Sequence, residues 1–404
     1  MDLKAAARER FKRSERHLID LSHRIHAHPE LGFEEERAAA WLCETMADAG
    51  FSVERGICGM PTAFAARAGS GPLQLAICAE YDCLPGIGHA CGHNIIATMG
   101  AGAAIAAAKV ADDAGLTITL LGTPAEEVCN GGGKILMIER GGFQDVHAAM
   151  MVHPAPIDMS TPQMIAAAMF EVHYTGKEAH ASAFPELGIN AADAITVAQT
   201  AIGLLRQHIH DTDRIHGIVI DGGAAPNIIP AHTAVRYFAR AKSLDRLGDL
   251  LPRLHRCFEA GAIATGCKYE IMSGDKPYAE MRHDYEIAAI YRRNAEALGR
   301  FFADPEPAVV AKGGGGFRAM GGGGFRAMGA GSTDMGNVSL QLPSIHPLIG
   351  INSAPAVNHQ PEFTAACATP DADRAVVDGA LAMAWSAIDI AGDAALSKRL
   401  IGNG

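Results

Sequence analysis

The sequence predicts an α/β protein in which a larger domain with a mixed sheet flanked by helices is interrupted by a smaller α+β domain. Three observations predict this. Early in the chain, short apolar runs alternate with helical stretches, which is typical of a sheet with parallel strands. Between residues 164 and 275 the order becomes strand, helix, strand, strand, helix, strand, as in a ferredoxin-like unit. After that, helices and glycine-rich loops resume, so we expect a discontinuous larger domain of residues 1–163 and 276–404 with residues 164–275 inserted into it.

The predicted elements of the larger domain follow from apolar patterning. Three apolar runs predict buried strands at Leu73–Ala79, Leu116–Leu121 and Val146–Val152. Helical patterns predict helices at 95–112 and 133–140, and an apolar helix closes the chain at 373–392.

The inserted segment has its own pattern. Half-exposed strands are predicted at residues 169–176, 216–223, 232–241 and 268–274, and helices at 190–207 and 244–264.

Composition and charge indicate which kinds of partner the protein has and how many domains it can form. The chain has 404 residues, 49% of them hydrophobic, which is enough for two domains. Its net charge of −11 and the absence of a long basic run argue against nucleic acid and anionic membranes as partners. The apolar run 95–108 is too short for a membrane span and predicts a buried helix.

Two further features predict a cytoplasmic protein. Residues 1–21 form a charged amphipathic pattern without the apolar core of a signal peptide. The nine cysteines are scattered without the regular spacing of a disulfide framework, which favours reduced thiols.

The octapeptide GGGGFRAM occurs twice without change at residues 313–328. A solenoid needs longer units and more copies, so we interpret the repeat as a duplication tolerated in a loop. The alternative is a glycine-rich lip over a functional site, continuous with residues 329–337.

Polar side chains follow each of the three predicted strands of the larger domain. Glu80 and Asp82 follow the first strand, Glu126 and Glu127 the second, and His153 the third. Because ligands bind at the carboxyl ends of the strands in open α/β sheets, we expect these residues to share one edge.

Cys91 and His93 lie on alternate residues of a glycine-flanked segment, and in an extended or looped chain both side chains would point the same way. Thiolate and imidazole suit zinc and other first-row metals, although such a pair also occurs by chance. The adjacent Glu126 and Glu127 face different directions at a strand end, so one could bind metal while the other faces water. Their alternative role is an exposed acidic pair that opens a helix.

Four other residues have weaker signals. Asp82 could orient a metal-binding histidine, or form a turn before Pro85. His180, in the insert, would more often be structural. Asn227 and Arg240 could hold a carboxylate, or be a turn residue and a surface cation.

Taken in order, these segments resemble the dinuclear-metal aminoacylase and carboxypeptidase family of metallopeptidases, in its amidohydrolase branch. The matching motifs are HRIHAHPELGFEE, AEYDCLPGIGHACGHN, TPAEE, MMVHP, GKEAHAS, GSTDMGNVS and NHQPEF, and they extend over essentially the whole chain. The forms EYD, GIGHACGHN and STDMGNVS are most similar to p-aminobenzoyl-glutamate hydrolases and β-alanyl-lysine-type dipeptidases.

The resemblance implies a zinc-peptidase-like fold with two divalent metal ions, zinc first and manganese, nickel or cobalt as alternatives. The implied metal ligands are Cys91, His93, Glu127, His153 and His359. Glu126 would be the general base and Asp82 would support the ligands. Glu80 stands where other branches carry a liganding histidine, so we assign it no ligand role.

The resemblance also implies that the insert is a lid and dimerisation domain, hinged near residues 164 and 275. His180 would reach the active site of the second subunit and stabilise the oxyanion, and Asn227 and Arg240 would hold the substrate carboxylate.

These features predict a homodimeric, metal-dependent amidohydrolase or peptidase that cleaves N-acyl or aminoacyl amino acids with a free carboxylate. A dipeptidase acting on β-alanyl or related dipeptides is the alternative within the enzyme class. The alternatives from other classes are a catalytically silent homologue that binds metal or ligand, and a thiol-based redox or metal-storage protein that uses Cys83 and Cys91.

Overall fold

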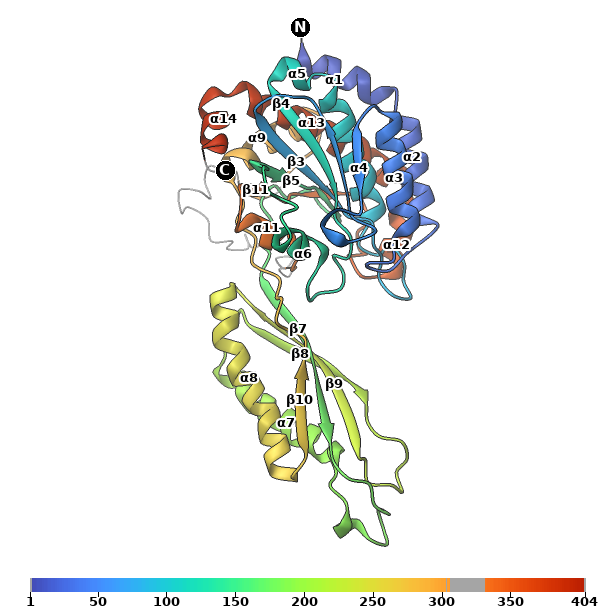
Figure 1. Cartoon of the computed structure of the whole chain (residues 1–404), viewed down its shortest axis with the longest axis vertical. Coiled ribbons are helices and arrows are strands. Elements are labelled where there is room, and N and C mark those ends of the chain that lie inside the picture. The colour runs from blue at the N-terminus through green and yellow to red at the C-terminus, as the bar shows by residue number, and fades with distance from the viewer. Residues whose placement is uncertain (1, 303, 306–330, 403–404) are drawn as a thin grey trace.

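Two sheets organise the chain, one in a larger body and one in an insert that extends away from it (Figure 1). The structure is a computed structural model that describes residues 2–302, 304–305 and 331–402. The repeated octapeptide at 313–328 therefore lies outside the described residues.

The larger sheet is mixed, as predicted. In the described residues it has six strands in the order β1-β2-β4-β3-β5-β11. Strands β3, β4, β5 and β11 run parallel to their neighbours in this group, whereas β1 and β2 are antiparallel additions at one edge. The strands are β1 Ser52–Arg55, β2 Phe64–Ala68, β3 Leu73–Ala79, β4 Leu116–Gly122, β5 Ala148–Met150 and β11 Ser344–Ile345.

The third predicted strand, Val146–Val152, was too long. Only β5, Ala148–Met150, pairs in the large sheet, and the chain then leaves it. His153 begins β6, His153–Ala155, which pairs with β12, Leu348–Gly350, in a separate two-stranded sheet. The change of sheet occurs next to Pro154, whose nitrogen cannot donate to a sheet hydrogen bond.

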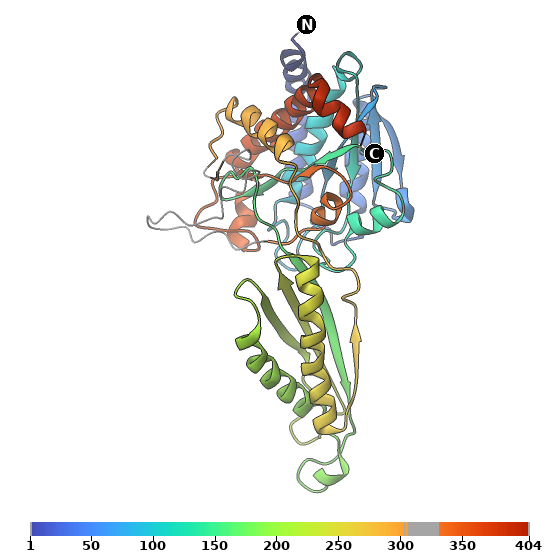
Figure 2. The same ribbon diagram turned by 90° about the vertical axis from the view of Figure 1, so that its left-hand side faces the viewer.

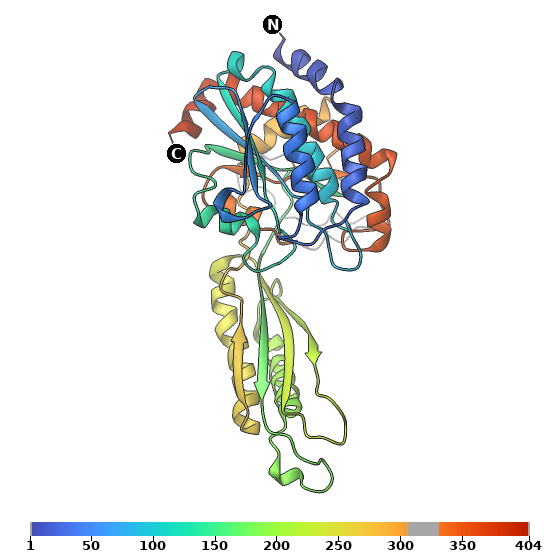
Figure 3. The same cartoon turned by 45° about the vertical axis from the view of Figure 1, so that its right-hand side comes forward.

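Helix α4, His93–Ala108, is the central helix of the larger body. It packs against β3 and β4 on one side and against α1, α2 and α13 on the others, and nearly every residue of it is buried. Figure 3 shows α2 and α3 in front of this layer. The predicted helix 95–112 is divided, because Val110 leaves the helical conformation before α5.

The helices of the larger body flank its sheet. They are α1 Leu3–Lys12, α2 Glu15–His26, α3 Glu36–Asp48, α4, α5 Ala111–Ala114, α6 Gly133–Glu139, α9 Tyr285–Glu296, α11 Met335–Ser339, α12 Pro361–Ala366, α13 Pro370–Gly392 and α14 Ala394–Ile401, with a short 3-10 helix η1 at Ile57–Gly59.

Among the described residues, α13 is the one helix long and apolar enough to cross a membrane. However, 72% of its most apolar window is buried within the protein. It packs against α4 and α9, which is the position of a core helix.

The insert has the predicted element order and a four-stranded antiparallel sheet in the order β10-β7-β9-β8. Helices α7 and α8 cover one face of this sheet (Figure 2). The elements are β7 Ala166–Thr175, η2 Pro185–Leu187, α7 Ala191–Leu205, η3 Arg206–His208, β8 Arg214–Asp221, β9 His232–Ala241, α8 Leu244–Thr265 and β10 Lys268–Met272.

Strand β7 shows how the two faces of the insert differ. Phe170, Val172 and Tyr174 alternate along it and are buried against the helices. The intervening Glu171 and His173 lie on the face that no helix covers in the described structure.

Helices α7 and α8 approach each other closely at Gly261, where a Cβ atom would overlap the backbone carbonyl of Ala194. We predict that Gly261→Ala forces the two helices apart and lowers the free energy of unfolding by about 1–3 kcal/mol. Chemical denaturation of the full chain measures this. Gly248→Ala, in the same helix but with open space around it, is the matched control. It should be neutral or up to about 1 kcal/mol more stable, because alanine favours helix. Equal stability of the two variants would contradict the packing argument.

Candidate active site

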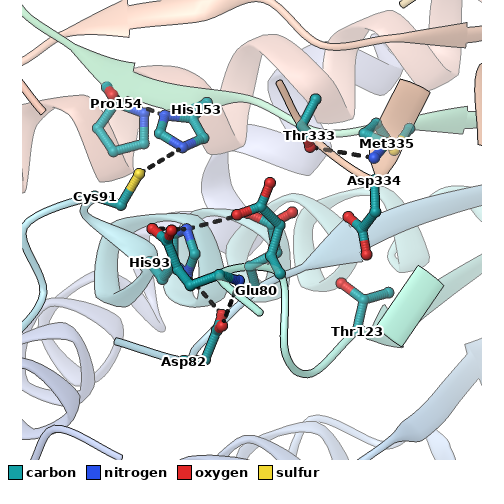
Figure 4. Close-up of polar contacts among 12 residues, drawn as sticks. Glu80, Asp82, Cys91, His93, Thr123, His153, Pro154, Thr333, Asp334 and Met335 are labelled. Atoms are coloured by element: carbon teal, nitrogen blue, oxygen red, sulfur yellow. Dashed lines mark hydrogen bonds and ion pairs between the residues drawn. The ribbon is translucent and has the colours of Figure 1, made fainter. Parts of the chain in front are cut away.

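The residues that follow the parallel strands meet at one edge of the larger sheet. Glu80 and Asp82 come after β3, Glu126 and Glu127 after β4, and His153 after β5. The structure brings them together with Cys91 and His359, as Figure 4 shows for several of them.

Four overlapping groups of side chains offer ligand atoms that lie within 4.8 Å of one another. They are Cys91, His93 and His153; Cys91, Glu127 and His359; His93, Glu126 and Glu127; and Glu80, Glu126 and Asp334. The first two groups share Cys91 and contain all five ligands implied by the resemblance. Two adjacent cation positions with a common thiolate are therefore available.

Asp82 fixes the orientation of His93. Its Oδ1 lies 2.8 Å from His93 Nδ1, and its Oδ2 accepts a hydrogen bond of 2.9 Å from the backbone N–H of Glu127. Both side chains are completely buried. Since Nδ1 faces the carboxylate, Nε2 of His93 is left free to bind a metal. Asp82 thus positions two candidate ligand residues, His93 and Glu127, at once.

The convergence of Cys91 and His93 has a different cause from the predicted one. The segment is not a strand, so alternation does not align the two side chains. Instead His93 begins α4, and Gly92 before it has a left-handed φ of 78°. A Cβ atom at Gly92 would overlap the ring of Pro154. Only glycine permits both the turn and the close approach of this segment to β6.

A second turn with a left-handed residue orients Glu126 and Glu127. Ala125 has φ of 60°, which is uncommon for a residue with a side chain. Its N–H donates a 2.8 Å hydrogen bond to Oε1 of Glu35, a fully buried residue. Burial raises the pKa of Glu35 to about 7. Glu35 lies in the motif HRIHAHPELGFEE, and no individual role was predicted for it from the sequence.

Lys134 is a fully buried cation beside the site. Its Nζ lies 2.5 Å from Glu80 Oε1 and 2.5 Å from Asp334 Oδ1, and its backbone N–H donates to Asp334 Oδ2. Burial alone would raise the pKa of Glu80, but Lys134 and His93 outweigh it and lower that pKa to about 2. The second oxygen of Glu80 lies 3.5 Å from His93 Nε2. Neither Lys134 nor Asp334 was predicted as a site residue from the sequence.

Glu126 is a buried acid that lies close to Glu80, Glu127 and Asp334. Burial and the charges of Glu80 and Glu127 raise the pKa of Glu126 well above its ordinary value. The hydroxyl of Tyr278 donates a hydrogen bond to its backbone carbonyl. A carboxyl group whose pKa is raised in this way is suited to accept and return a proton.

His359 completes the site from its exposed rim. Its backbone has φ of 70°, and its N–H donates a 2.8 Å hydrogen bond to Ala90. Its Nε2 lies 3.5 Å from Cys91 Sγ and 3.7 Å from Glu127 Oε1. Its side chain is 57% exposed, so this part of the site is open to solvent.

The residues fit a pair of divalent cations. His93 Nε2, Glu127 Oε1 and Glu80 Oε2 are buried and have no hydrogen-bond partner within the described structure. Leaving three such atoms unpaired is costly, and a bound cation removes the cost. The donor set of sulfur, imidazole nitrogen and carboxylate oxygen suits zinc and other first-row metals.

The three predicted residues of the insert lie at two opposite ends of it. His180 and Asn227 lie together in loops at the far end of the insert, where Ala181 N–H donates to the carbonyl of Asn227. Arg240 lies at the opposite end of β9, where its Nη1 donates a 2.9 Å hydrogen bond to Ser332. The eight residue steps from His232 to Arg240 span about 27 Å of strand. Asn227 and Arg240 therefore do not meet within one chain.

Removing the buried cation tests the charge balance of the site. We predict that Lys134→Met lowers the free energy of unfolding by about 3–5 kcal/mol, because two buried carboxylates lose their counter-charge. Urea denaturation measures the change. Lys276→Met is the control, since its ion pair with Glu139 is partly exposed and worth about 1 kcal/mol or less. If both variants were equally stable, the buried pair would not be a stabilising element.

Comparison with known proteins places the chain in a family. Residues 76–365 match peptidase family M20/M25/M40. Xaa-Arg dipeptidase of Mus musculus is 37% identical over 404 aligned positions, which cover 96% of this chain and 89% of the relative. One of the subunits of p-aminobenzoyl-glutamate hydrolase from Escherichia coli (strain K12) is 34% identical over 61% of this chain and 55% of its own length.

Among solved structures, a dinuclear metal binding peptidase of the M20 family from Bacillus subtilis has the same fold, with a TM-score of 0.66. It is 19% identical, and the match covers 94% of this chain and 99% of that one. The chain therefore belongs to peptidase family M20/M25/M40 and is a metal-dependent hydrolase of peptide or amide bonds.

Proposed function

We propose that the enzyme is a dipeptidase or N-acyl amino acid hydrolase that removes a C-terminal amino acid with a free carboxylate. The observation that carries the proposal is the buried Glu126 next to two overlapping sets of metal-ligand side chains. The dipeptidase of Mus musculus matches 96% of the chain and the aminobenzoyl-glutamate hydrolase 61%, which favours a dipeptide over an aryl amide.

We place the two proposed cations in the first two groups of ligand side chains described above. One would be held by Cys91, His93 and His153, and the other by Cys91, Glu127 and His359. Two divalent cations bound there would polarise the substrate carbonyl and lower the pKa of a water molecule between them. The thiolate favours zinc, and manganese, nickel and cobalt are the alternatives.

Glu126 performs the proton transfers. It accepts a proton from the attacking water as the bond from water oxygen to the carbonyl carbon forms. When the bond from carbon to nitrogen breaks, the same carboxyl group returns that proton to the leaving amine, so the site ends in its initial state. Asp82 keeps the imidazole of His93 and the backbone of Glu127 in place during both steps.

Glu126→Gln separates chemistry from metal binding. We predict that turnover falls by about 10²–10⁴-fold, the usual contribution of a general base, while the metal content per chain stays unchanged. Hydrolysis of a panel of Xaa-Arg, β-alanyl-lysine and p-aminobenzoyl-glutamate substrates, with elemental analysis of the same samples, measures both quantities.

Glu44→Gln, at an exposed glutamate of α3 in the larger body, is the control, and it should retain activity. A wild-type protein that binds metal but hydrolyses none of the panel would favour the catalytically silent alternative. Loss of metal from the Glu126 variant would instead make Glu126 a ligand.

We also propose a homodimer formed through the insert. β8 is one of the two edge strands of the insert sheet, and its residues Ile218, Val219 and Ile220 are 61%, 47% and 39% exposed. An apolar edge strand of this kind is a surface for pairing with another strand. A second copy is the proposed occupant because His180 and Asn227, at the far end of the insert, are too distant from the site of their own chain. In a dimer they would complete the site of the partner, with Arg240 contributed from that site's own side.

Mixing two weakly active variants tests whether each active site is built from residues of both subunits. We predict that Glu126→Gln and His180→Ala chains are each weakly active alone. After dissociation and reassociation together, half of the dimers are mixed, and each mixed dimer has one intact site. Activity should then recover to about a quarter of the wild-type value. No recovery, with mixed dimers shown by mass spectrometry, would mean that His180 serves no partner site.

We further propose a cytoplasmic location. All nine cysteines are free of disulfides, which supports a reducing compartment.

A further inference from the structure

A pair of histidines lies on the open face of the insert, apart from the candidate active site. His173 is on β7 and His232 begins β9, at the end of the sheet far from the larger body. The register places His173 opposite Ala234 and His232 opposite Thr175, so the two are diagonal neighbours on one face. Nδ1 of His173 lies 3.2 Å from Nε2 of His232.

The outer nitrogen of each ring faces a carboxylate. Nε2 of His173 lies 3.2 Å from Glu171 Oε2, and Nδ1 of His232 lies 2.7 Å from Asp221 Oδ2. Both carboxylates are themselves held, Glu171 by Arg236 and Asp221 by the N–H of Gly223. Both rings are thus fixed in orientation, each by a partner on its outer side.

In this arrangement the two inner nitrogens, His173 Nδ1 and His232 Nε2, face each other and require a positive charge between them. A neutral imidazole carries one N–H, and a carboxylate accepts it. The two nitrogens that face each other then both present lone pairs at 3.2 Å, which repel unless a proton or a metal cation lies between them. A carboxylate on the outer nitrogen is also the usual support of a metal-binding histidine.

The separation of the two nitrogens suits a metal. Two zinc–nitrogen bonds of about 2.05 Å at a tetrahedral angle place their nitrogens about 3.3 Å apart. The side chains of His173 and His232 are 26% and 47% exposed, so a cation from solvent reaches them and water completes its coordination.

We propose that His173 and His232 bind one divalent transition-metal ion, with zinc as the representative ion, in addition to those of the active site. Bound there, the ion links β7 to β9 directly, and Asp221 extends the link to β8. It therefore stabilises the folded insert in proportion to its occupancy.

Equilibrium dialysis of the full-length protein against stepwise concentrations of free Zn²⁺ tests the site, with zinc per chain measured by elemental analysis. We expect the wild type to bind one equivalent more than the double variant His173→Gln/His232→Gln. Each single variant should weaken that equivalent at least tenfold. The control His208→Gln/His210→Gln removes two exposed histidines of the insert outside the pair and should match the wild type.

A second measurement guards against a folding defect. Peptidase activity and the zinc bound most tightly should be the same in all of these proteins, because the active site is untouched. Excess Zn²⁺ should raise the melting temperature of the wild type and the control more than that of the double variant. Equal zinc uptake and equal melting shifts in all proteins would overturn the proposal and leave a shared proton between the rings.

Discussion

The rest of the site depends on how its buried negative charge is balanced. Glu80, Glu126 and Asp334 lie within 4.8 Å of one another in the interior, with Glu127 beside them. Lys134 neutralises this cluster on one side through Glu80 and Asp334. On the other side, Glu80 Oε2 and Glu127 Oε1 have no hydrogen-bond partner and lie 3.5 Å and 3.9 Å from His93 Nε2, where a bound cation would balance their charge. Metal affinity and folding stability are therefore linked: the fixed ammonium lets the carboxylates be buried, and the remaining charge attracts the metals.

Left-handed backbone conformations are the second feature that builds the site. Gly92, Ala125 and His359 all have them, and each directs a candidate ligand or lies next to one. Glycine adopts this conformation without strain, whereas at Ala125 and His359 it is costly and persists only where surrounding contacts hold it. The carboxylate of Glu35 holds Ala125, the ring of Pro154 restricts Gly92, and the carbonyl of Ala90 holds His359. The ligands are aimed by contacts from segments distant in the sequence, so the site forms only when the larger body is complete.

The sequence predicted those parts that local pattern determines. The apolar runs predicted β3 and β4, and the position of ligands at the carboxyl ends of strands predicted that Glu80, Asp82, Glu126, Glu127 and His153 lie together. Cys91 and His93 do lie together, but the reason predicted for it, alternation along an extended or looped segment, was wrong. The sequence does not distinguish a turn at glycine from an extended segment. Lys134 could not be predicted: a lysine at the start of a helix is normally solvated, and only the fold shows that its partners are buried. His359 came from resemblance alone, since more than 200 residues separate it from the nearest ligand.

The two halves of the site differ in how they are made. Glu80 and Asp82, which follow β3, and His93, which begins α4, are fully buried, and these two elements pack against each other in the core. His359 is exposed at the rim, and His180 and Asn227 lie at the end of the insert, outside the site of their own chain. In the buried half, the low dielectric of the folded interior strengthens the attraction between the carboxylates and a cation. In the dimer proposed above, the exposed half would admit substrate before surrounding it, because its residues would lie on a separate body. The position of His180 and Asn227 far from the site of their own chain is compatible with that proposal, in which a second chain places them over the site.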